Sequence, residues 1–414
     1  MKTRRFIVIL SLLLCTFLSF NPSIQQLAQF PDFQTQTKLA APAISGFWSH
    51  VIQFNEVPAV KTLAGPTAQT VQLTYKLFGI FPLKSSEVEV MPEMSLVPGG
   101  ESIGVTLQSK GVMVVGQAPV VGADGKKQFP ARDAGIETGD VLLKINQEEV
   151  QSDQEVASLV NDAGKSQEGL QITFKHQGQV LVRTVHPVYC PDDNRYRIGL
   201  YVRDAAAGVG TLTYYDPATN KYGALGHVIN DADTNQKIDV SSGQVVASDI
   251  HSIEKGRRGH PGEKVGSFDL GSSFSGTIEK NTRTGIFGTL QGKLKNPYFS
   301  KPIPVGWQTE VKTGPAKIYT VLHGEKIGEY SIDIERVMLN RTDSKNMVIR
   351  VTDPRLLAET GGIVQGMSGS PIVQNGKLIG AVTHVFVNDS SRGYGVFIEN
   401  MLRDSGFLRE GKAA

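Results

Sequence analysis

The stretch from Gly361 to Pro371, Gly-Gly-Ile-Val-Gln-Gly-Met-Ser-Gly-Ser-Pro, places two serines in a glycine-rich loop ahead of an apolar run. A nucleophilic hydroxyl needs an exposed, tightly turned backbone whose amides are free to stabilise a developing oxyanion. Gly366, Gly369 and Pro371 favour such a turn. We therefore predict a serine nucleophile loop that leads into a β-barrel strand. An ordinary Gly- and Ser-rich connection is the alternative.

The pattern from Gly366 to Pro371 resembles the Gly-Asp-Ser-Gly-Gly-Pro loop of chymotrypsin-like peptidases. The resemblance implies that Ser368 is the nucleophile and that Ser370 fills a position that is glycine in that family. It also implies that the backbone N–H groups of Gly366 and Ser368 form the oxyanion hole.

A serine hydroxyl becomes a good nucleophile only when a neighbouring imidazole accepts its proton. Of the eight histidines, His227 has the most suitable setting. It ends the strand-like run Gly223-Ala-Leu-Gly-His-Val-Ile229, whose small residues would allow a second barrel to approach closely. We predict that His227 is the general base. The alternatives are His251 and His260, in polar loops, and His384, on the strand after the nucleophile, where substrate-pocket walls are usual.

The imidazole must in turn be oriented, usually by a carboxylate. Asp353 is the predicted acid because it ends a strand-like run, at a position fixed by Pro354, 15 residues before Ser368. In chymotrypsin-like enzymes the acid usually lies much farther from the serine. Asp239 and Asp249 are therefore the competing candidates, and a turn aspartate is the other interpretation of Asp353.

Many short strand-like runs separated by Gly, Asn and Asp turns follow Arg195, with little helix. Regular spacing of this kind is typical of a β-sandwich or barrel, and about 220 residues suit a double barrel. The predicted fold is mainly β, with a chymotrypsin-like double-barrel serine peptidase domain at 188–414.

Residues 97–187 form a separate pattern of strands and two helices. The second helix is predicted to start at a capping box, Ser152 with Glu155, and to run to about Ala163. The module resembles a PDZ domain of the bacterial protease-associated kind. That resemblance rests on Ala134-Gly135, on Gly139-Asp-Val-Leu142 and on Ile145-Asn146.

The same resemblance assigns Ile103, Gly104 and Val105 to the carboxylate-binding loop of the PDZ module. In such a loop, free amides capture a peptide terminus while the peptide adds to the sheet edge. The alternative is a PDZ module that only packs against its neighbour. A PDZ module beside a serine loop points to proteolysis.

The chain begins with Lys2, Arg4 and Arg5, followed by a predominantly apolar run of 15 residues from Phe6 to Phe20. This pattern predicts a secretory signal or an uncleaved membrane anchor at 1–20, because a full transmembrane helix usually needs about 20 residues. Residues 21–96 are expected to form a flexible stalk followed by a small β element. The protein is therefore expected to be exported.

The formal net charge is +2, from 42 basic and 40 acidic residues, so no basic surface indicates nucleic-acid binding. Cys190 is the one cysteine of the exported part and has no partner there for a disulfide. No His-x-x-x-His or paired-Cys arrangement suggests a metal. We predict neither a metal nor an organic cofactor.

Several motifs together closely resemble the stage IV sporulation protein B peptidases. They are the export segment, the PDZ module, Ala224-Leu-Gly-His-Val228, Ser252-Ile-Glu-Lys255 with Pro261-Gly-Glu-Lys264, Val351-Thr-Asp-Pro-Arg-Leu356, and Gly362 to Pro371. The match extends over nearly the whole chain after residue 70, and the final motif is the most specific.

The resemblance implies a signalling serine endopeptidase that is exported across the forespore membrane into the intermembrane space. It implies processing of itself near the N-terminus, under control of the PDZ domain. The implied partner is the inhibitory subunit of a membrane-embedded metalloprotease, whose cleavage leads to activation of a sigma factor. The competing hypothesis is a catalytically inactive PDZ scaffold that binds a membrane partner.

Overall fold

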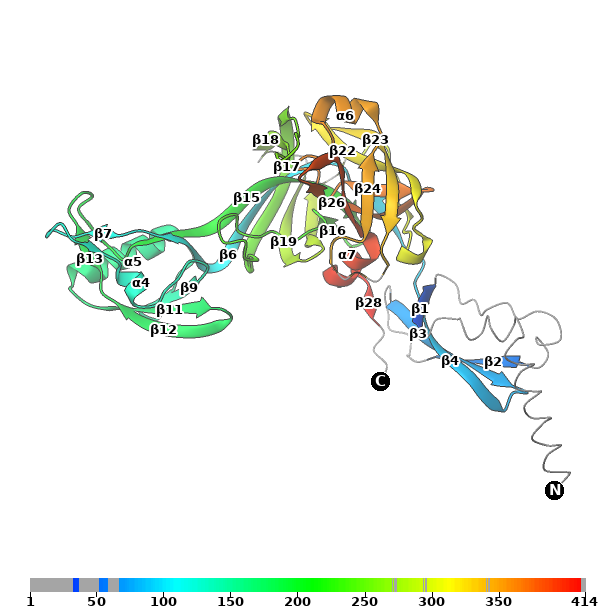
Figure 1. Cartoon of the computed structure of the whole chain (residues 1–414), viewed down its shortest axis with the longest axis horizontal. Helices are drawn as coiled ribbons and strands as arrows, with labels where there is room; N and C mark the ends of the chain where they lie inside the picture. The colour runs from blue at the N-terminus through cyan, green and yellow to red at the C-terminus, as the bar shows by residue number, and fades with distance from the viewer. Residues whose placement is uncertain are drawn as a thin grey trace, which may run out of the picture. The chain divides into compact units, whose positions relative to one another are not determined.

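The computed structural model describes residues 33–36, 52–58, 67–269, 271, 274–292, 294, 296–339, 341 and 343–410 (Figure 1). Strands predominate, as predicted. The chain divides into two units, of which the second, Leu96–Ile303 with Lys312–Ser405, holds all the predicted site residues. Among the described residues, no helix combines the length and apolar character needed to cross a membrane. The predicted export segment at 1–20 lies outside the described residues.

The first unit contains a five-stranded sheet with the order β1-β4-β3-β2 and β28 beside β3. Its strands are β1 (Phe33–Gln36), β2 (Ile52–Pro58), β3 (Thr67–Leu77), β4 (Phe81–Val90) and β28 (Arg409–Glu410). The predicted small β element is therefore present. Within the segment predicted as a flexible stalk, β1, β2 and the start of β3 pair in this sheet.

A first closed barrel lies in the second unit, in the strand order β6-β17-β19-β20-β16-β15, and the pairing of β15 with β6 closes it. Its strands are β6 (Ser102–Gln117), β15 (Leu200–Tyr215), β16 (Lys221–Ala224), β17 (Val240–Glu254), β19 (Phe274–Thr282) and β20 (Gly285–Gly292). Alternate residues of β6, Ile103, Val105 and Leu107, point into its apolar core.

A second closed barrel follows, in the order β22-β23-β24-β27-β26-β25. Its strands are β22 (Gly314–His323), β23 (Lys326–Val337), β24 (Met347–Val351), β25 (Pro371–Gln374), β26 (Lys377–Phe386) and β27 (Asp389–Phe397). Helix α6 (Pro354–Thr360) follows β24, and α7 (Ile398–Ser405) follows β27. The predicted chymotrypsin-like double barrel is confirmed.

The PDZ module packs two helices on a curved sheet. Its elements include α4 (Pro130–Asp133), β9 (Val141–Ile145), α5 (Asp153–Lys165), β11 (Leu170–His176) and β12 (Gln179–Val185). The capping box of Ser152 and Glu155 at the start of α5 is confirmed. Aliphatic residues of α5 and of the strands, with Phe174, form a buried core of the module's own.

The module is inserted into the first barrel rather than placed ahead of it. One half of β6 pairs in the barrel with β17, while Val112 and Met113 pair with β9 of the module. The return strand β15 likewise pairs with the PDZ end of β6 from Leu200 to Arg203 and with the barrel end after Ala205. A peptidase domain that starts at 188 is therefore incomplete, because it lacks the barrel strand supplied by β6.

Candidate active site

The loop between α6 and β25 carries the predicted nucleophile, and strand β15 holds it from the first barrel. The hydroxyls of Thr211 and Thr213 donate to the backbone oxygens of Gly366 and Gly369, at 2.7 and 2.8 Å. Gly369 has φ +95°, and a Cβ there would lie 2.0 Å from the backbone oxygen of Thr211. The loop can approach β15 this closely only with glycine at this position.

The two serines of the loop lie in different surroundings. Ser368 is partly exposed and lines a cavity of about 560 Å³, whereas Ser370 is fully buried and donates its hydroxyl to the backbone oxygen of Met367. Of these two serines, only Ser368 can meet a substrate without the loop unfolding.

The backbone amides at the predicted oxyanion positions are free. In the described part of the chain, neither Gly366 N–H nor Ser368 N–H donates a hydrogen bond, although Thr211 N–H and Gly369 N–H around them do. Gly366 has φ +90°, a backbone conformation that favours glycine. Free amides beside a nucleophile are what an oxyanion hole requires.

His227 enters the same cavity from a tight turn at the end of β16. Leu225 and Gly226 both adopt left-handed backbone conformations, with φ of 69° and 70°. For leucine this conformation is strained, which is typical of functional sites. No pattern in the sequence predicts that turn.

The tautomer of His227 suits a general base. Its Nδ1 lies 2.8 Å from the backbone oxygen of Val228, so Nδ1 carries the proton and Nε2 is left as the acceptor. Burial lowers the pKa of His227, and the Val228 carbonyl opposes that shift. The imidazole is therefore neutral, and able to accept a proton, at neutral pH.

His384 lies beside His227, with ring centroids 5.0 Å apart, and lines the same cavity. Its pKa is lowered to about 4 by burial, and further by His227 and Lys345. Its Nδ1 is buried without a hydrogen-bond partner. His384 therefore forms part of the pocket wall, as expected for the strand after the nucleophile.

The serine hydroxyl does not point at either imidazole. Ser368 Oγ donates to the backbone oxygen of Thr383 at 2.8 Å, and between the described side chains of Ser368 and His227 there is no hydrogen bond. Both side chains nevertheless line one cavity.

The structure does not bring Asp353 to His227. The Asp353 carboxylate caps α6 and accepts two hydrogen bonds from the Arg355 guanidinium, at 3.0 and 2.9 Å, and one from the backbone N–H of Ser331. The Arg355 guanidinium is the main cause of its strongly lowered pKa. In this arrangement the Asp353 oxygens are occupied and Asp353 does not line the cavity, so its role as the orienting acid stays a prediction.

The other candidates also lie elsewhere. Asp239 pairs with Lys175 at 3.1 Å, and Asp249 lies 4.0 Å from His251, with all four side chains well exposed. His260 belongs to a surface turn that starts at Arg257. None of these lines the Ser368 cavity. The group that orients His227 is the Val228 carbonyl, which the sequence could not reveal.

The predicted PDZ loop at Ile103, Gly104 and Val105 is a further correction. These residues lie in the middle of β6, with β15 on one edge and β17 on the other. Their backbone groups are used in the first barrel, and a Cβ at Gly104 would lie 2.4 Å from the Phe268 ring. They cannot add a peptide strand.

A groove suited to an extended peptide lies instead between α5 and the residues from Arg195 to Val202, with a volume of about 230 Å³. Val156 and Val160 of α5 form its apolar floor, and Ile198-Gly199-Leu200 leads into β15. Leu200 to Arg203 pair with β6 along one edge. Ile198-Gly199-Leu200 has the same pattern as Ile103-Gly104-Val105, so the sequence contained two candidates for the peptide-binding loop of the PDZ module.

The described residues hold no group of three His, Cys, Asp or Glu side chains arranged to bind a metal. Cys190 is buried as a free thiol.

A family model described as SpoIVB peptidase S55 matches residues 194–402, just over half of the chain, and one described as PDZ domain matches residues 102–186. No curated protein matches the chain. Among solved structures, the chain is similar to the active form of the Rv3671c protease from M. tuberculosis. The identity is 15%, the match covers 50% of this chain and 78% of that chain, and the TM-score is 0.29. It is also similar to the PDZ domain of the SdrC-like protein from Listeria monocytogenes, with 20% identity, 22% and 87% coverage, and a TM-score of 0.18.

Proposed function

This chain belongs to the SpoIVB peptidase S55 family, and we propose that it is a serine endopeptidase with Ser368 as nucleophile and His227 as general base. The observation that carries the proposal is the convergence on one cavity of Ser368, a neutral imidazole with a free Nε2, and two unpaired loop amides.

In the proposed reaction, Ser368 Oγ leaves the Thr383 carbonyl and attacks the carbonyl carbon of the scissile peptide bond. His227 Nε2 takes the hydroxyl proton, and the N–H groups of Gly366 and Ser368 stabilise the oxyanion. Collapse of the tetrahedral intermediate breaks the C–N bond, and the imidazolium returns its proton to the leaving amine. Water, deprotonated by His227, then hydrolyses the acyl ester and regenerates Ser368.

The Val228 carbonyl holds the imidazole tautomer in this proposal, and Asp353 supports the loop instead. Asp353 caps α6, whose C-terminal Gly361 begins the nucleophile loop. A main-chain carbonyl carries no full charge, so it stabilises the imidazolium less than a carboxylate would.

Substrate recognition is proposed to use the groove between α5 and β15. A peptide segment held there is kept near the cavity, because β15 continues from the groove to Ala205–Val209 in the cavity wall. Tethering of this kind raises the effective concentration of a cleavage site without new catalytic contacts.

The family membership and the basic-apolar N-terminus support a more specific proposal. The protein is exported across the forespore membrane, shortens itself near its N-terminus, and cleaves an inhibitory subunit of a membrane-embedded metalloprotease complex. That cleavage releases sigma-factor activation during endospore formation.

The proposal is tested with the purified full chain and a fluorophosphonate probe, followed by peptide mapping and by electrophoresis to detect self-shortening. Labelling at Ser368, together with self-cleavage that the same probe abolishes, is expected. A folded protein that neither shortens nor reacts would contradict the enzyme and favour the inactive PDZ scaffold.

A further inference from the structure

The segment Val228–Asp239 follows His227 directly and connects β16 to β17. Asn281 of β19 fixes both ends of this segment: its side-chain oxygen accepts from Ile229 N–H, and its amide donates to the backbone oxygens of Ile229 and Ile238. Asn230, Asp231 and Ala232 of the segment line the Ser368 cavity. We call this segment the histidine loop.

The tip of the histidine loop is organised around a buried carboxylate. The side chain of Asp231 is 2% exposed and accepts from Asp233 N–H and from both the backbone N–H and the hydroxyl of Thr234. Burial acts to raise the pKa of Asp231, but these bonds and the bond from Arg203 outweigh it and lower the pKa. The carboxylate is therefore ionised and depends on its partners.

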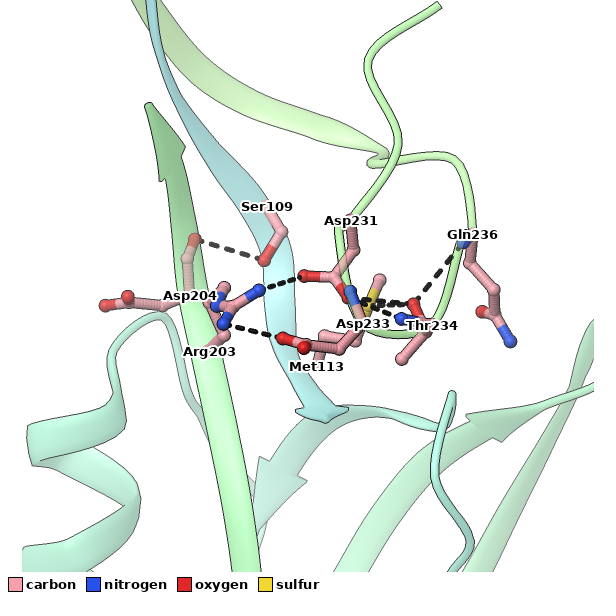
Figure 2. Close-up of polar contacts among 8 residues, drawn as sticks. All are labelled: Ser109, Met113, Arg203, Asp204, Asp231, Asp233, Thr234 and Gln236. Carbon is pink, nitrogen blue, oxygen red and sulfur yellow. Dashed lines mark hydrogen bonds and ion pairs between the residues drawn. The ribbon is translucent and has the colours of Figure 1, made fainter. Parts of the chain in front are cut away.

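Arg203 is the cation that faces this carboxylate (Figure 2). Its Nη1 lies 3.0 Å from Asp231, and its Nη2 lies 2.7 Å from the exposed carboxylate of Asp233. Arg203 belongs to β15, directly after the groove residues Leu200–Val202, and it lines the Ser368 cavity together with Ala205–Val209 of the same strand. The strand is irregular at this point, where its pairing with β6 shifts after Arg203.

We propose that Arg203 is a positioning residue for catalysis, which fixes the histidine loop through Asp231 and thereby fixes the orientation of His227. The inference rests on the proposed function. It adds that the catalytic base is held in place by a cation on a strand that borders both the peptide groove and the cavity.

The physical basis is the cost of leaving a buried carboxylate unpaired. Without Arg203, Asp231 keeps its hydrogen bonds within the loop but loses its one full counter-charge, so the loop tip is driven towards water. The contact with Asp233 is exposed and contributes little by comparison. Only Val228, Ile229 and Asn230 separate Asp231 from His227, so movement of the loop tip reaches His227 if it strains the Asn281 bonds at Ile229.

The test measures the rate of fluorophosphonate labelling at Ser368 in the full chain. Arg203→Gln is expected to lower the rate on the order of tenfold, because small misplacement of a catalytic group has large kinetic effects. Asp233→Asn, the matched control, is expected to stay within about twofold, as for other exposed ion pairs. Arg203→Gln combined with Asp231→Asn should recover part of the rate, because no buried charge is then unpaired.

The pH profile of labelling distinguishes positioning from general destabilisation. His384 and Ser368 share the cavity with His227, as do the charged groups Arg203 and Asp231, and Lys345 and Asp343 act on His384. If the histidine loop loosens, water reaches the His227 ring, so the acid limb of the Arg203→Gln profile should shift up towards the ordinary histidine pKa of 6.5. Arg203→Lys keeps a charged donor and should show a smaller shift in the same direction.

An unchanged rate in Arg203→Gln, or a lower rate with an unshifted acid limb, would overturn the inference. If Arg203→Gln fails to fold, the profile of Arg203→Lys decides in the same way. Absence of labelling in the unmodified protein would instead remove the proposed function, and this inference with it.

Discussion

Ser368 Oγ donates to the backbone carbonyl of Thr383, 2.8 Å away, and not to the imidazole that shares its cavity. The hydroxyl proton is thus hydrogen-bonded to a main-chain oxygen, which is too weak a base to remove it. In the proposed reaction this hydroxyl is unactivated until its side chain rotates towards His227.

Ser368→Ala should abolish probe labelling and self-cleavage with little change in thermal unfolding, because the hydroxyl is only partly buried and bonds one carbonyl. Ser370→Ala is the matched control. It removes a fully buried hydroxyl bonded to Met367, so it should cost stability, about 1 kcal/mol, and retain activity. An inactive Ser370→Ala beside an active Ser368→Ala would show that the loop register is wrong.

The pH dependence should follow the buried imidazoles. Since burial lowers the pKa of His227, the imidazole is still mostly neutral just below pH 6.5, and the acid limb of labelling should have its midpoint below that value.

His384 should make the stability of the fold depend on pH. Its pKa is about 4 in the folded protein, so as the pH falls the unfolded chain takes up this proton at a higher pH than the folded protein does. Its contribution to stability is present above pH 6.5 and is lost as the pH falls to about 4. His384→Gln should flatten this part of a plot of melting temperature against pH.

Asp353→Asn should act on stability first. The substitution removes the charge that pairs with Arg355 and weakens the cap of α6. Breaking a fully buried ion pair costs roughly 3 kcal/mol of folding stability. The cost here should be lower, because the Arg355 side chain is exposed. We expect a lower melting temperature and a labelling loss of about tenfold or less, far from the roughly 10⁴-fold loss of a triad aspartate. A variant with normal melting and a loss near 10⁴-fold would place Asp353 in the triad of the active state.

Substitutions at the two candidate peptide sites should have opposite outcomes. Gly104→Val forces a side chain into the Phe268 ring on the outer face of the first barrel, so both labelling and self-cleavage should fall with stability. Ala157→Arg fills the groove at an exposed position of α5 and should reduce cleavage of protein substrates while Ser368 still reacts. Unimpaired self-cleavage in Ala157→Arg would mean that the groove is not used.

Lys264 packs against the nucleophile loop at Gly366. Its side-chain carbons lie 3.1 to 3.2 Å from where a Cβ would stand on Gly366, and its amine donates to the Thr320 hydroxyl at 2.8 Å. Burial lowers the pKa of Lys264 from 10.5 to about 7. The unfolded chain therefore binds the proton more tightly, and the buried amine destabilises the fold most at pH 7 and below. Lys264→Met should raise the melting temperature at pH 6, with a gain that shrinks as the pH rises towards 10.5. An equal gain at pH 6 and pH 10 would exclude a charge effect.

The sequence by itself determined the parts of this protein that depend on local pattern. Alternating short strands predicted the β-barrels, the spacing of Ser152 and Glu155 predicted the cap of α5, and the glycines around Ser368 predicted a tight loop. Each of these follows from backbone preferences over a few residues, which sequence patterns report directly.

Only the tertiary structure decided which residues meet. Ile103-Gly104-Val105 and Ile198-Gly199-Leu200 are alike as sequence, and the difference lies in which of them has a free edge once β6 closes the first barrel. Asp353 ends a strand as a triad acid could, yet Arg355, two residues on, occupies its oxygens. Strand pairing between distant segments depends on how the whole chain closes, and for that reason local pattern could not show that His227 Nδ1 bonds the Val228 carbonyl in this arrangement.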